Sequence, residues 1–182
     1  MSLKEYVRTS FELQGKDLLE NVQDLTAEEL AFRPAPHANS IGFLWWHIAR
    51  VEDGWFQRSI QRQPHLWVSA GWAKRFGMPE EMRDMGYNYT VEQIEAFATP
   101  GRELMLEYWR AVRGGTLAFV DGWDPENDTI EVRAPWGGTM SVGDVCAQVL
   151  WELNQHSGQI AYLRGLQRGL QRPEYMGPLA PS

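Results

Sequence analysis

A regular apolar seam near the end of the chain constrains the fold more than any other feature of this sequence. Its members recur at alternating steps of four and three residues: Val142, Cys146, Val149, Leu153, His156, Ile160 and Leu163. This spacing is typical of a helix that packs along its whole length against other helices. Ser141 and Asp144 form a capping box directly before the seam. The seam therefore predicts a long final helix within a helical bundle.

Three further segments have helical periodicity behind a capping signal, and they cover about residues 2–24, 40–62 and 90–115. Pro100 is expected to kink the last of them. Thr26 to Glu29 predicts one short turn of helix. Residues 64–89 predict a long connection with a short helical piece, and residues 129–140 predict a small hairpin. We therefore expect an all-α four-helix bundle with one long crossover and a small β-hairpin before the last helix.

Composition narrows the class of protein. The chain has 182 residues, of which 43% are hydrophobic and 23% charged, with a net charge of −7. We expect one domain over residues 1–172 and a C-terminal tail over 173–182. The acidic balance, without a basic stripe, argues against a nucleic-acid partner or an anionic membrane surface. A single cysteine excludes an internal disulfide and, with no apolar leader at the N-terminus, predicts a cytoplasmic protein. The nine tryptophans are interpreted as core fillers, or alternatively as the lining of a pocket.

His156 lies on the apolar seam, where an imidazole needs partners for its nitrogens. Glu152 lies one helical turn earlier on the same face, so both side chains can reach one ion. His47 lies beside the apolar seam of the second predicted helix and can converge with them if these helices pack together. Two imidazoles and one carboxylate suit zinc, nickel or iron, and three protein ligands leave an open position. The alternative is a solvated Glu–His pair and a hydrogen-bonded core histidine.

The segments NSIGFLWWHIARVEDGW around His47 and SVGDVCAQVLWELNQHSGQIAYLRG around His156 resemble the two signature helices of the DinB/YfiT-like superfamily. The resemblance spans nearly the whole chain and implies a metal held by a triad, usually of three histidines. By position these are His47, residue 152 and His156. This chain departs from the pattern because Glu152 stands where the family usually has histidine. A carboxylate hardens the ligand set, which favours iron or manganese more than three imidazoles would.

The resemblance also implies an activity and partners. Characterised relatives include transferases and isomerases that use low-molecular-weight thiols, so we expect a divalent-metal-dependent enzyme acting on a small electrophilic substrate, and a homodimer. A hydrolase that uses metal-activated water is a variant of this hypothesis. The alternatives are a stress-related bundle that binds a metal or small ligand without turnover, and a purely structural protein. Gln159 is expected to position a water or substrate, or to bond a neighbouring helix, and the Tyr108 hydroxyl to reach the pocket. We expect no role for His37 or His65, and inert packing for Cys146.

Overall fold

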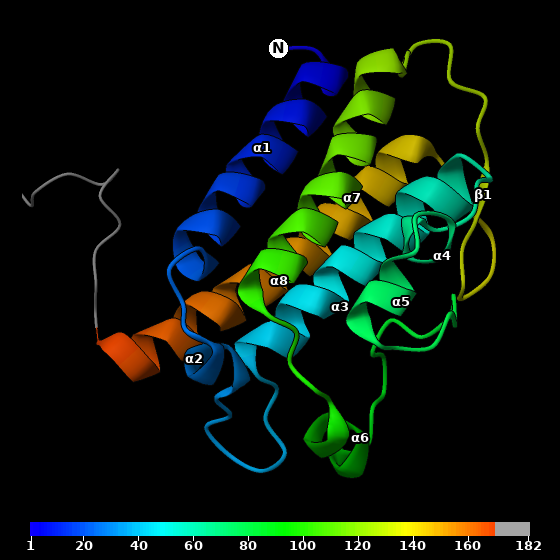
Figure 1. The fold of residues 1–182 in the computed structure, drawn as a ribbon. Helices are drawn as coiled ribbons and strands as arrows, with labels where there is room; N and C mark the ends of the chain where they lie inside the picture. Colours follow the sequence, from blue (N-terminus) through cyan, green and yellow to red (C-terminus); the bar gives the residue numbers. More distant parts are fainter. Residues whose placement is uncertain (170–182) are drawn as a thin grey trace, which may run out of the picture.

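Four long helices form a bundle in the computed structural model, which describes residues 1–169 (Figure 1). They are α1 (Leu3–Val22), α3 (Ile41–Asp53), α7 (Arg102–Gly122) and α8 (Val142–Arg168), and a π-helix, η1 (Gly54–Ile60), continues α3. Both α1 and α3 pack against α7 and α8, so α1 and α3 lie diagonally across the bundle. The predicted fold is confirmed. The predicted tail, residues 173–182, lies outside the described residues, and the domain boundary at 172 stays a prediction.

Side-chain capping sets where the helices begin, as the sequence indicated. The hydroxyls of Ser2, Ser40 and Ser141 each accept a hydrogen bond from a backbone amide three residues later, at the N-termini of α1, α3 and α8. Thr26 does the same for the short helix α2 (Ala27–Ala31), and Thr90 for α6 (Val91–Ala96). Each cap satisfies an amide that the first helical turn leaves without a partner.

Helix α3 is the central element, because all its residues from Ile41 to Asp53 are buried. It includes the charged residues Arg50, Glu52 and Asp53, each 0% exposed. A helix that is surrounded on every side needs apolar residues around its whole circumference, and buried charges on it need partners. The hydrogen-bond partners of these three buried charges therefore identify the segments of the chain that α3 anchors.

The connection between η1 and α7 is long because α3 and α7 run in the same direction (Figure 1). It contains α4 (Leu66–Ser69) and α5 (Trp72–Phe76), followed by a loop and then α6. The long crossover with short helical pieces is thus confirmed. The prediction of one kinked helix over residues 90–115 is wrong, because α6 and α7 are separate helices.

Two physical causes explain how the structure differs from the single helix predicted over residues 90–115. Pro100 separates α6 from α7, and the burial of residues beyond 115 extends α7. Pro100 lacks an amide hydrogen and disfavours helical geometry at the preceding residue, so the chain leaves the helix after α6 and α7 starts afresh. Gly114 and Gly115 were expected to end the helix, yet α7 continues to Gly122. Thr116 and Val120 beyond them are fully buried, and this burial offsets a glycine cost of about 1 kcal/mol each.

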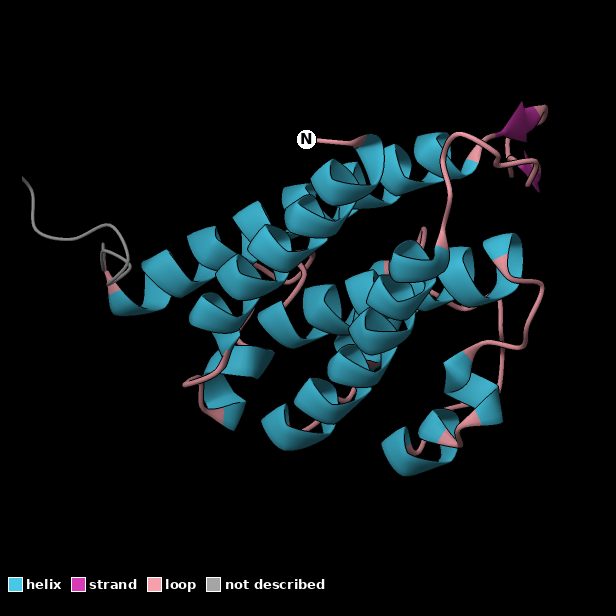
Figure 2. Cartoon of the chain, turned by 90° about the horizontal axis from the view of Figure 1, so that it is seen from above, coloured by secondary structure: helices cyan, strands magenta, loops and turns pink. Residues whose placement is uncertain are grey.

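The predicted hairpin is confirmed as two short antiparallel strands, β1 (Val132–Arg133) and β2 (Thr139–Met140). Figure 2 shows it at one end of the bundle, directly before α8 begins. Its turn contains Gly137 and Gly138, both with positive φ angles of 100° and 82°, which glycine adopts without strain.

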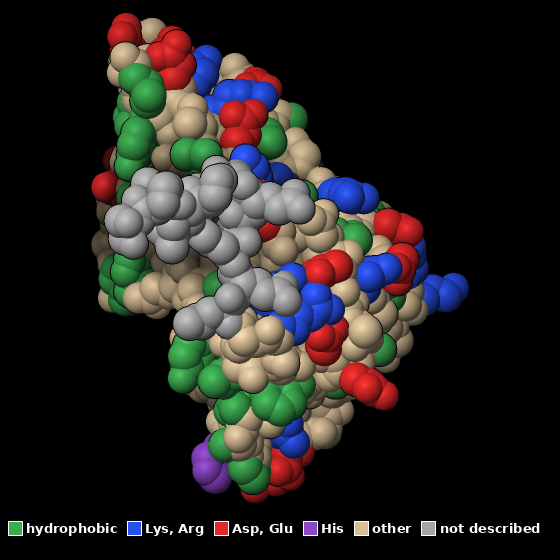
Figure 3. All heavy atoms as spheres, turned by 90° about the vertical axis from the view of Figure 1, so that its left-hand side faces the viewer, with side chains coloured by type: hydrophobic (Ala, Val, Ile, Leu, Met, Phe, Trp, Pro, Cys, Tyr) green, Lys and Arg blue, Asp and Glu red, His purple; other side chains and the backbone are tan. Residues whose placement is uncertain are grey.

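Helices α1 and α8 lie side by side and parallel, since successive residues of one bond to successive residues of the other. Gln14 donates to Ser157, and further along the backbone of Asn21 accepts from Arg164. Arg164 and Arg168 then pair with Asp24, just after α1. Figure 3 shows basic and acidic side chains intermixed on this side of the molecule. Within residues 1–169, no helix combines the length and the apolar character needed to cross a membrane.

The tryptophans mostly fill the core. Six of them have relative exposures of 7% or less: Trp45, Trp46, Trp67, Trp72, Trp109 and Trp123. Trp136 in the hairpin turn and Trp151 on α8 are more than half exposed. The first interpretation of the tryptophans is therefore confirmed for these six, which bury large apolar surfaces between helices.

Candidate metal centre

Three polar side chains spaced three residues apart on α3 hold the crossover against the bundle. Arg50 donates to the backbone carbonyls of Glu81, Met82 and Asp84. Asp53 accepts from the amides at the start of α4. His47 completes the row, because its Nδ1 bonds the Met85 carbonyl. Most residues of α3 are apolar, but these three polar residues position the loop that borders the candidate site.

His47, Glu152 and His156 lie together, as the sequence and the resemblance suggested. Each offers one ligand atom, and these atoms all lie within 4.8 Å of one another. Glu152 Oε1 lies 3.2 Å from His47 Nε2 and 3.5 Å from His156 Nε2. The two imidazole rings are perpendicular, with centroids 4.9 Å apart. The His47 side chain is 5% exposed, against 13% for Glu152 and 17% for His156, so the cluster opens toward solvent on the α8 side.

The hydrogen bonds of His47 fix its tautomer. The Met85 carbonyl only accepts, so Nδ1 of His47 carries a hydrogen and donates it. A neutral ring then has a bare lone pair on Nε2, and this lone pair faces the Glu152 carboxylate, which also only accepts. Two acceptors at 3.2 Å repel each other unless positive charge lies between them. The arrangement therefore calls for a cation or for a second proton on the ring.

His156, like His47, has a hydrogen-bond partner on its Nδ1, and this partner is a residue of its own helix. Its Nδ1 lies 2.8 Å from Gln159 Oε1, so with Nδ1 protonated its Nε2 is also free to face Glu152. Gln159 was expected to position a water or to bond a neighbouring helix, and it instead bonds His156 itself. Such partners on the outer nitrogen set the orientation and basicity of a ligating histidine.

The charges within the cluster reinforce each other. Hydrogen bonds from His156 and His47 lower the pKa of Glu152 to about 2, against the opposing effect of burial. Burial alone would lower the pKa of His156, but its hydrogen bonds with Glu152 and Gln159 outweigh burial and raise it. The carboxylate is thus held ionised beside two nitrogen donors. Ligation of a metal uses the ionised carboxylate and neutral imidazoles, so a bound ion would replace the proton that the raised pKa favours on His156.

The separations also fit a metal ion. Zinc bonds of about 2.0–2.2 Å at tetrahedral angles place neighbouring ligand atoms roughly 3.3–3.6 Å apart. The two measured separations from Glu152 Oε1, 3.2 and 3.5 Å, lie close to this range. The donor set of two nitrogens and one oxygen suits zinc, nickel or iron rather than magnesium or calcium, which prefer oxygen ligands.

Two expectations about the seam of α8 and its surroundings need correction. His156 lies at the edge of the seam, and Ser157, at 3% exposure, occupies the buried position facing α1. Tyr108 does not reach the triad with its hydroxyl; it donates to Asp53 at 3.0 Å, in the row that holds the crossover. The difference arises because α7 packs its Tyr108 against Trp67 and Trp72 of the crossover.

The remaining histidines and the cysteine lie outside the cluster. His65 is buried at the start of α4, where burial lowers its pKa to about 4. His37 is exposed in the loop before α3. Cys146 is buried on α8, where burial raises the pKa of its thiol to about 12. A thiol held protonated in this way is a packing residue, as expected.

The loop beside the site also contributes residues that periodicity did not identify. Met85 supplies a backbone carbonyl, and Tyr87 packs its ring edge-on against His47 with centroids 4.8 Å apart. Gly86 lies between them with φ of 86°. A backbone carbonyl leaves no trace in the sequence, but the glycine and asparagine in GYNY were a visible signal of a tight turn.

Replacing Gly86 with alanine should destabilise the protein by about 1–3 kcal/mol, the usual cost of a strained backbone position. Its Cβ would lie 2.9 Å from Phe43 Cζ and 3.0 Å from Trp46, in addition to the positive φ. Gly138→Ala is the matched control, because Gly138 has φ of 82° and nothing within 4 Å of its would-be Cβ. Urea unfolding should give a larger loss for Gly86→Ala. Equal losses would show that contact with α3 does not hold this loop.

Comparison with known proteins agrees with this description. The family model of the DinB superfamily matches residues 10–160. The crystal structure of a conserved protein from Enterococcus faecalis is similar in fold, with a TM-score of 0.81 and 23% sequence identity over 93% of this chain and 99% of that chain. Among curated proteins, none matches this chain significantly. The matched range includes α3, the crossover and all three residues of the cluster.

Proposed function

This chain belongs to the DinB superfamily, and we propose that it is a metalloprotein in which His47, Glu152 and His156 hold one divalent transition-metal ion. The observation that carries the proposal is the bonding of His47. Its Nδ1 is committed to the Met85 carbonyl, and its Nε2 faces a carboxylate oxygen at 3.2 Å. A bound cation removes the repulsion between these two acceptors and uses the lone pairs of both.

We further propose that the metal serves an enzyme that transfers a low-molecular-weight thiol to a small electrophile, or isomerises such a substrate through a thiol adduct. A bound transition-metal ion with an open position would supply the Lewis acidity that ionises a thiol near neutral pH. The chain's own residues orient and shield the site. Met85 and Gln159 fix the rings, while Phe43 and Tyr87 pack against His47.

Two alternatives compete with the enzyme. A bundle that binds a metal or a small ligand without turnover would have the same three residues and the same metal content. A purely structural role would leave Glu152 paired with the two histidines and no metal bound. The thiol partner and the homodimer also stay predictions. The exposed apolar side chains of α1 and α8, Tyr6, Leu13, Trp151, Tyr162 and Leu166, offer a surface that a second copy would cover.

Metal analysis of the untagged protein separates the structural alternative from the other two. After incubation with zinc, nickel or ferrous iron and removal of excess metal, we expect about one equivalent bound, as for a single three-ligand site. Less than roughly a tenth of an equivalent for every metal would exclude the site. Turnover of thiols with electrophiles that rises in proportion to metal content would then distinguish the enzyme from the binder.

Variants at Glu152 test the third ligand, where the chain departs from the usual family pattern. Glu152→Gln keeps the size of the side chain but removes its charge, and should weaken metal binding at least tenfold, the lower range for residues that support a metal site. Glu152→His restores the usual trio of histidines and should keep the metal. Isothermal titration measures both. Unchanged affinity in Glu152→Gln would show that the carboxylate is only a neighbour.

A further inference from the structure

The peptide group between Met85 and Gly86 has a hydrogen-bond partner on each side. Its carbonyl, on Met85, accepts from Nδ1 of His47. Its amide, on Gly86, donates to Asp84 Oδ1 at 3.3 Å. A peptide group is planar, and in the trans form its carbonyl and its amide hydrogen point in opposite directions. The Asp84 carboxylate and the His47 ring therefore hold one rigid unit from opposite sides.

This peptide group could otherwise turn over. Gly86 has φ of 86°, but glycine adopts positive and negative φ about equally well. In β-turns, a change in the sign of φ at the second central residue accompanies a rotation of the preceding peptide group by about 180°. Such a rotation would carry the Met85 carbonyl away from His47 and leave Nδ1 without its acceptor. A bond that holds the Gly86 amide therefore also holds the direction of the Met85 carbonyl.

Asp84 is itself held at both its backbone and its side chain. Its backbone carbonyl accepts from Arg50 Nε at 3.2 Å and from Arg50 Nη2 at 3.0 Å, and Arg50 is 0% exposed on α3. Its side-chain Oδ1 also accepts from the hydroxyl of Tyr89 at 2.6 Å. The ring of Tyr89 in turn packs against aromatic side chains of α3. Asp84 thus ties this turn to the helix that carries His47.

We propose that Asp84 is a positioning residue of the metal centre, which holds the Gly86 amide and so directs the Met85 carbonyl at His47. Nδ1 of His47 then keeps its hydrogen, and Nε2 is left to bind the ion. The inference rests on the proposed function, since Asp84 acts on the metal only through Met85 and His47. What Asp84 must supply is an acceptor oxygen and not a negative charge. An asparagine side chain has such an oxygen, whereas alanine has none.

Zinc is the probe, and the full-length protein is compared with Asp84→Ala and Asp84→Asn. Competition with a chelator measures the affinity for zinc. Nitrogen-15 NMR of the imidazoles in the zinc-loaded protein shows which ring nitrogen carries the hydrogen and how fast this hydrogen exchanges with water. Asp84→Ala should lower the affinity about tenfold, the low end of the usual effect of losing a partner of a ligand, and the Nδ1 hydrogen of His47 should exchange faster. Asp84→Asn should keep both values of the parent.

Asp124→Ala is the matched control, because Asp124 makes the same kind of turn in the loop after α7. Its Oδ1 accepts from the Glu126 amide at 3.2 Å, and its Oδ2 accepts from the Asn127 side chain at 2.8 Å. This variant should change neither the affinity for zinc nor the exchange of the His47 hydrogen.

The outcomes separate this inference from the proposed function. If the parent binds zinc and Asp84→Ala keeps either the parent's affinity or its exchange rate, the role of Asp84 is refuted and the metal site stands. Equal losses in Asp84→Ala and Asp84→Asn also refute it, because the acceptor oxygen would then not be the cause. A loss of the helical circular dichroism in Asp84→Ala would make Asp84 a residue of the fold as a whole and overturn the inference. If the parent binds no zinc, both proposals fail.

Discussion

His47→Ala should abolish metal binding and loosen the crossover at the same time. The substitution removes a ligand, so affinity should fall more than about a hundredfold, beyond the 10–100-fold typical for a residue that merely supports a ligand. It also removes the donor to the Met85 carbonyl. This carbonyl is partly buried, so the loss of its partner should cost less than the roughly 1–3 kcal/mol of a fully buried group. Metal titration measures the first effect, and amide hydrogen exchange over residues 81–89 measures the second.

His156→Ala separates the two effects, because the outer nitrogen of His156 bonds Gln159 on its own helix and not the crossover. This variant should lose the metal but keep the exchange rates of the metal-free parent in the loop. His37→Ala, in an exposed loop, should change neither property. Retention of full affinity in His47→Ala would remove the main support for the metal site. Unchanged exchange in that variant would show that the bond from His47 to Met85 does not hold the loop.

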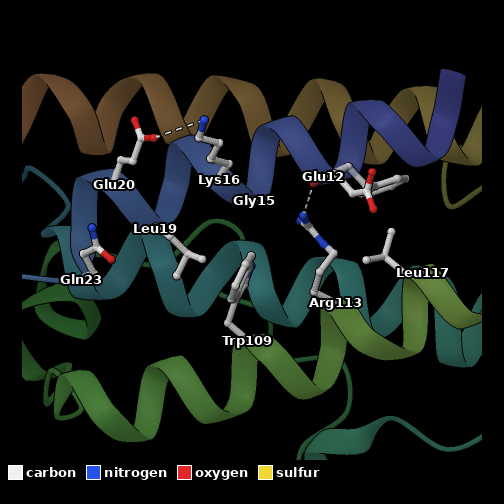
Figure 4. Close-up of a pocket in the computed structure, with 10 residues that line it drawn as sticks. Glu12, Gly15, Lys16, Leu19, Glu20, Gln23, Trp109, Arg113 and Leu117 are labelled. Atoms are coloured by element: carbon white, nitrogen blue, oxygen red, sulfur yellow. Dashed lines mark hydrogen bonds and ion pairs between the residues drawn. The ribbon is translucent and has the colours of Figure 1, made fainter. Parts of the chain in front are cut away.

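Arg113→Met should produce the largest loss of stability among single substitutions in the core. Arg113 extends from α7 toward α1 (Figure 4) and donates to Phe11, Gln14 and, through two hydrogen bonds of 2.8 and 2.9 Å, Glu52. Glu52 is 0% exposed and Arg113 5%. Removing the arginine leaves a buried carboxylate without its cation, which costs about 3–5 kcal/mol. For a chain of this size the melting temperature should fall by roughly 6–20 °C.

The double variant Arg113→Met with Glu52→Leu tests the reason for that loss. If the cost comes from a stranded charge, replacing both partners with apolar residues should recover most of the stability, as in other buried pairs. Arg75→Met is the surface control; it breaks an exposed pair with Glu107 and should cost about 1 kcal/mol or less. Urea unfolding followed by circular dichroism measures all three. A loss in Arg113→Met no larger than in Arg75→Met would contradict the argument.

The parts of the fold that follow from local rules were predictable from the sequence. The caps at Ser2, Ser40 and Ser141 and the apolar seam of α8 depend on residues within a few positions of one another. The length of α7 was not predictable, because Gly114 and Gly115 stay helical only through the burial of residues beyond them. Tertiary packing overrides a weak local preference in such cases.

The candidate site also contains residues that were predictable from the sequence and residues that were not. His156 and Glu152 share a helix face, so their proximity follows from spacing, while His47 was a candidate from its place beside a second apolar seam and the resemblance supported it. The partners of the two histidines are harder to foresee. Met85 acts through its backbone carbonyl, which any residue type supplies. Tyr87 reaches the cluster through a loop whose course depends on the contact of Gly86 with α3. Both depend on contacts between segments about forty residues apart in the chain, as His47 and Met85 are separated by 38 positions.

The parallel pairing of α1 and α8 has a consequence for synthesis of the chain. Gln14 meets Ser157, and Asn21 meets Arg164, across a separation of 143 residues in both cases. During translation α1, α3 and α7 leave the ribosome before the helix that covers their shared apolar surface. Glu152 and His156 emerge with that helix, so the nascent chain has His47 long before the three residues of the candidate metal site can come together. The proposed site can therefore form only after α8 has packed against α3 and the bundle has closed.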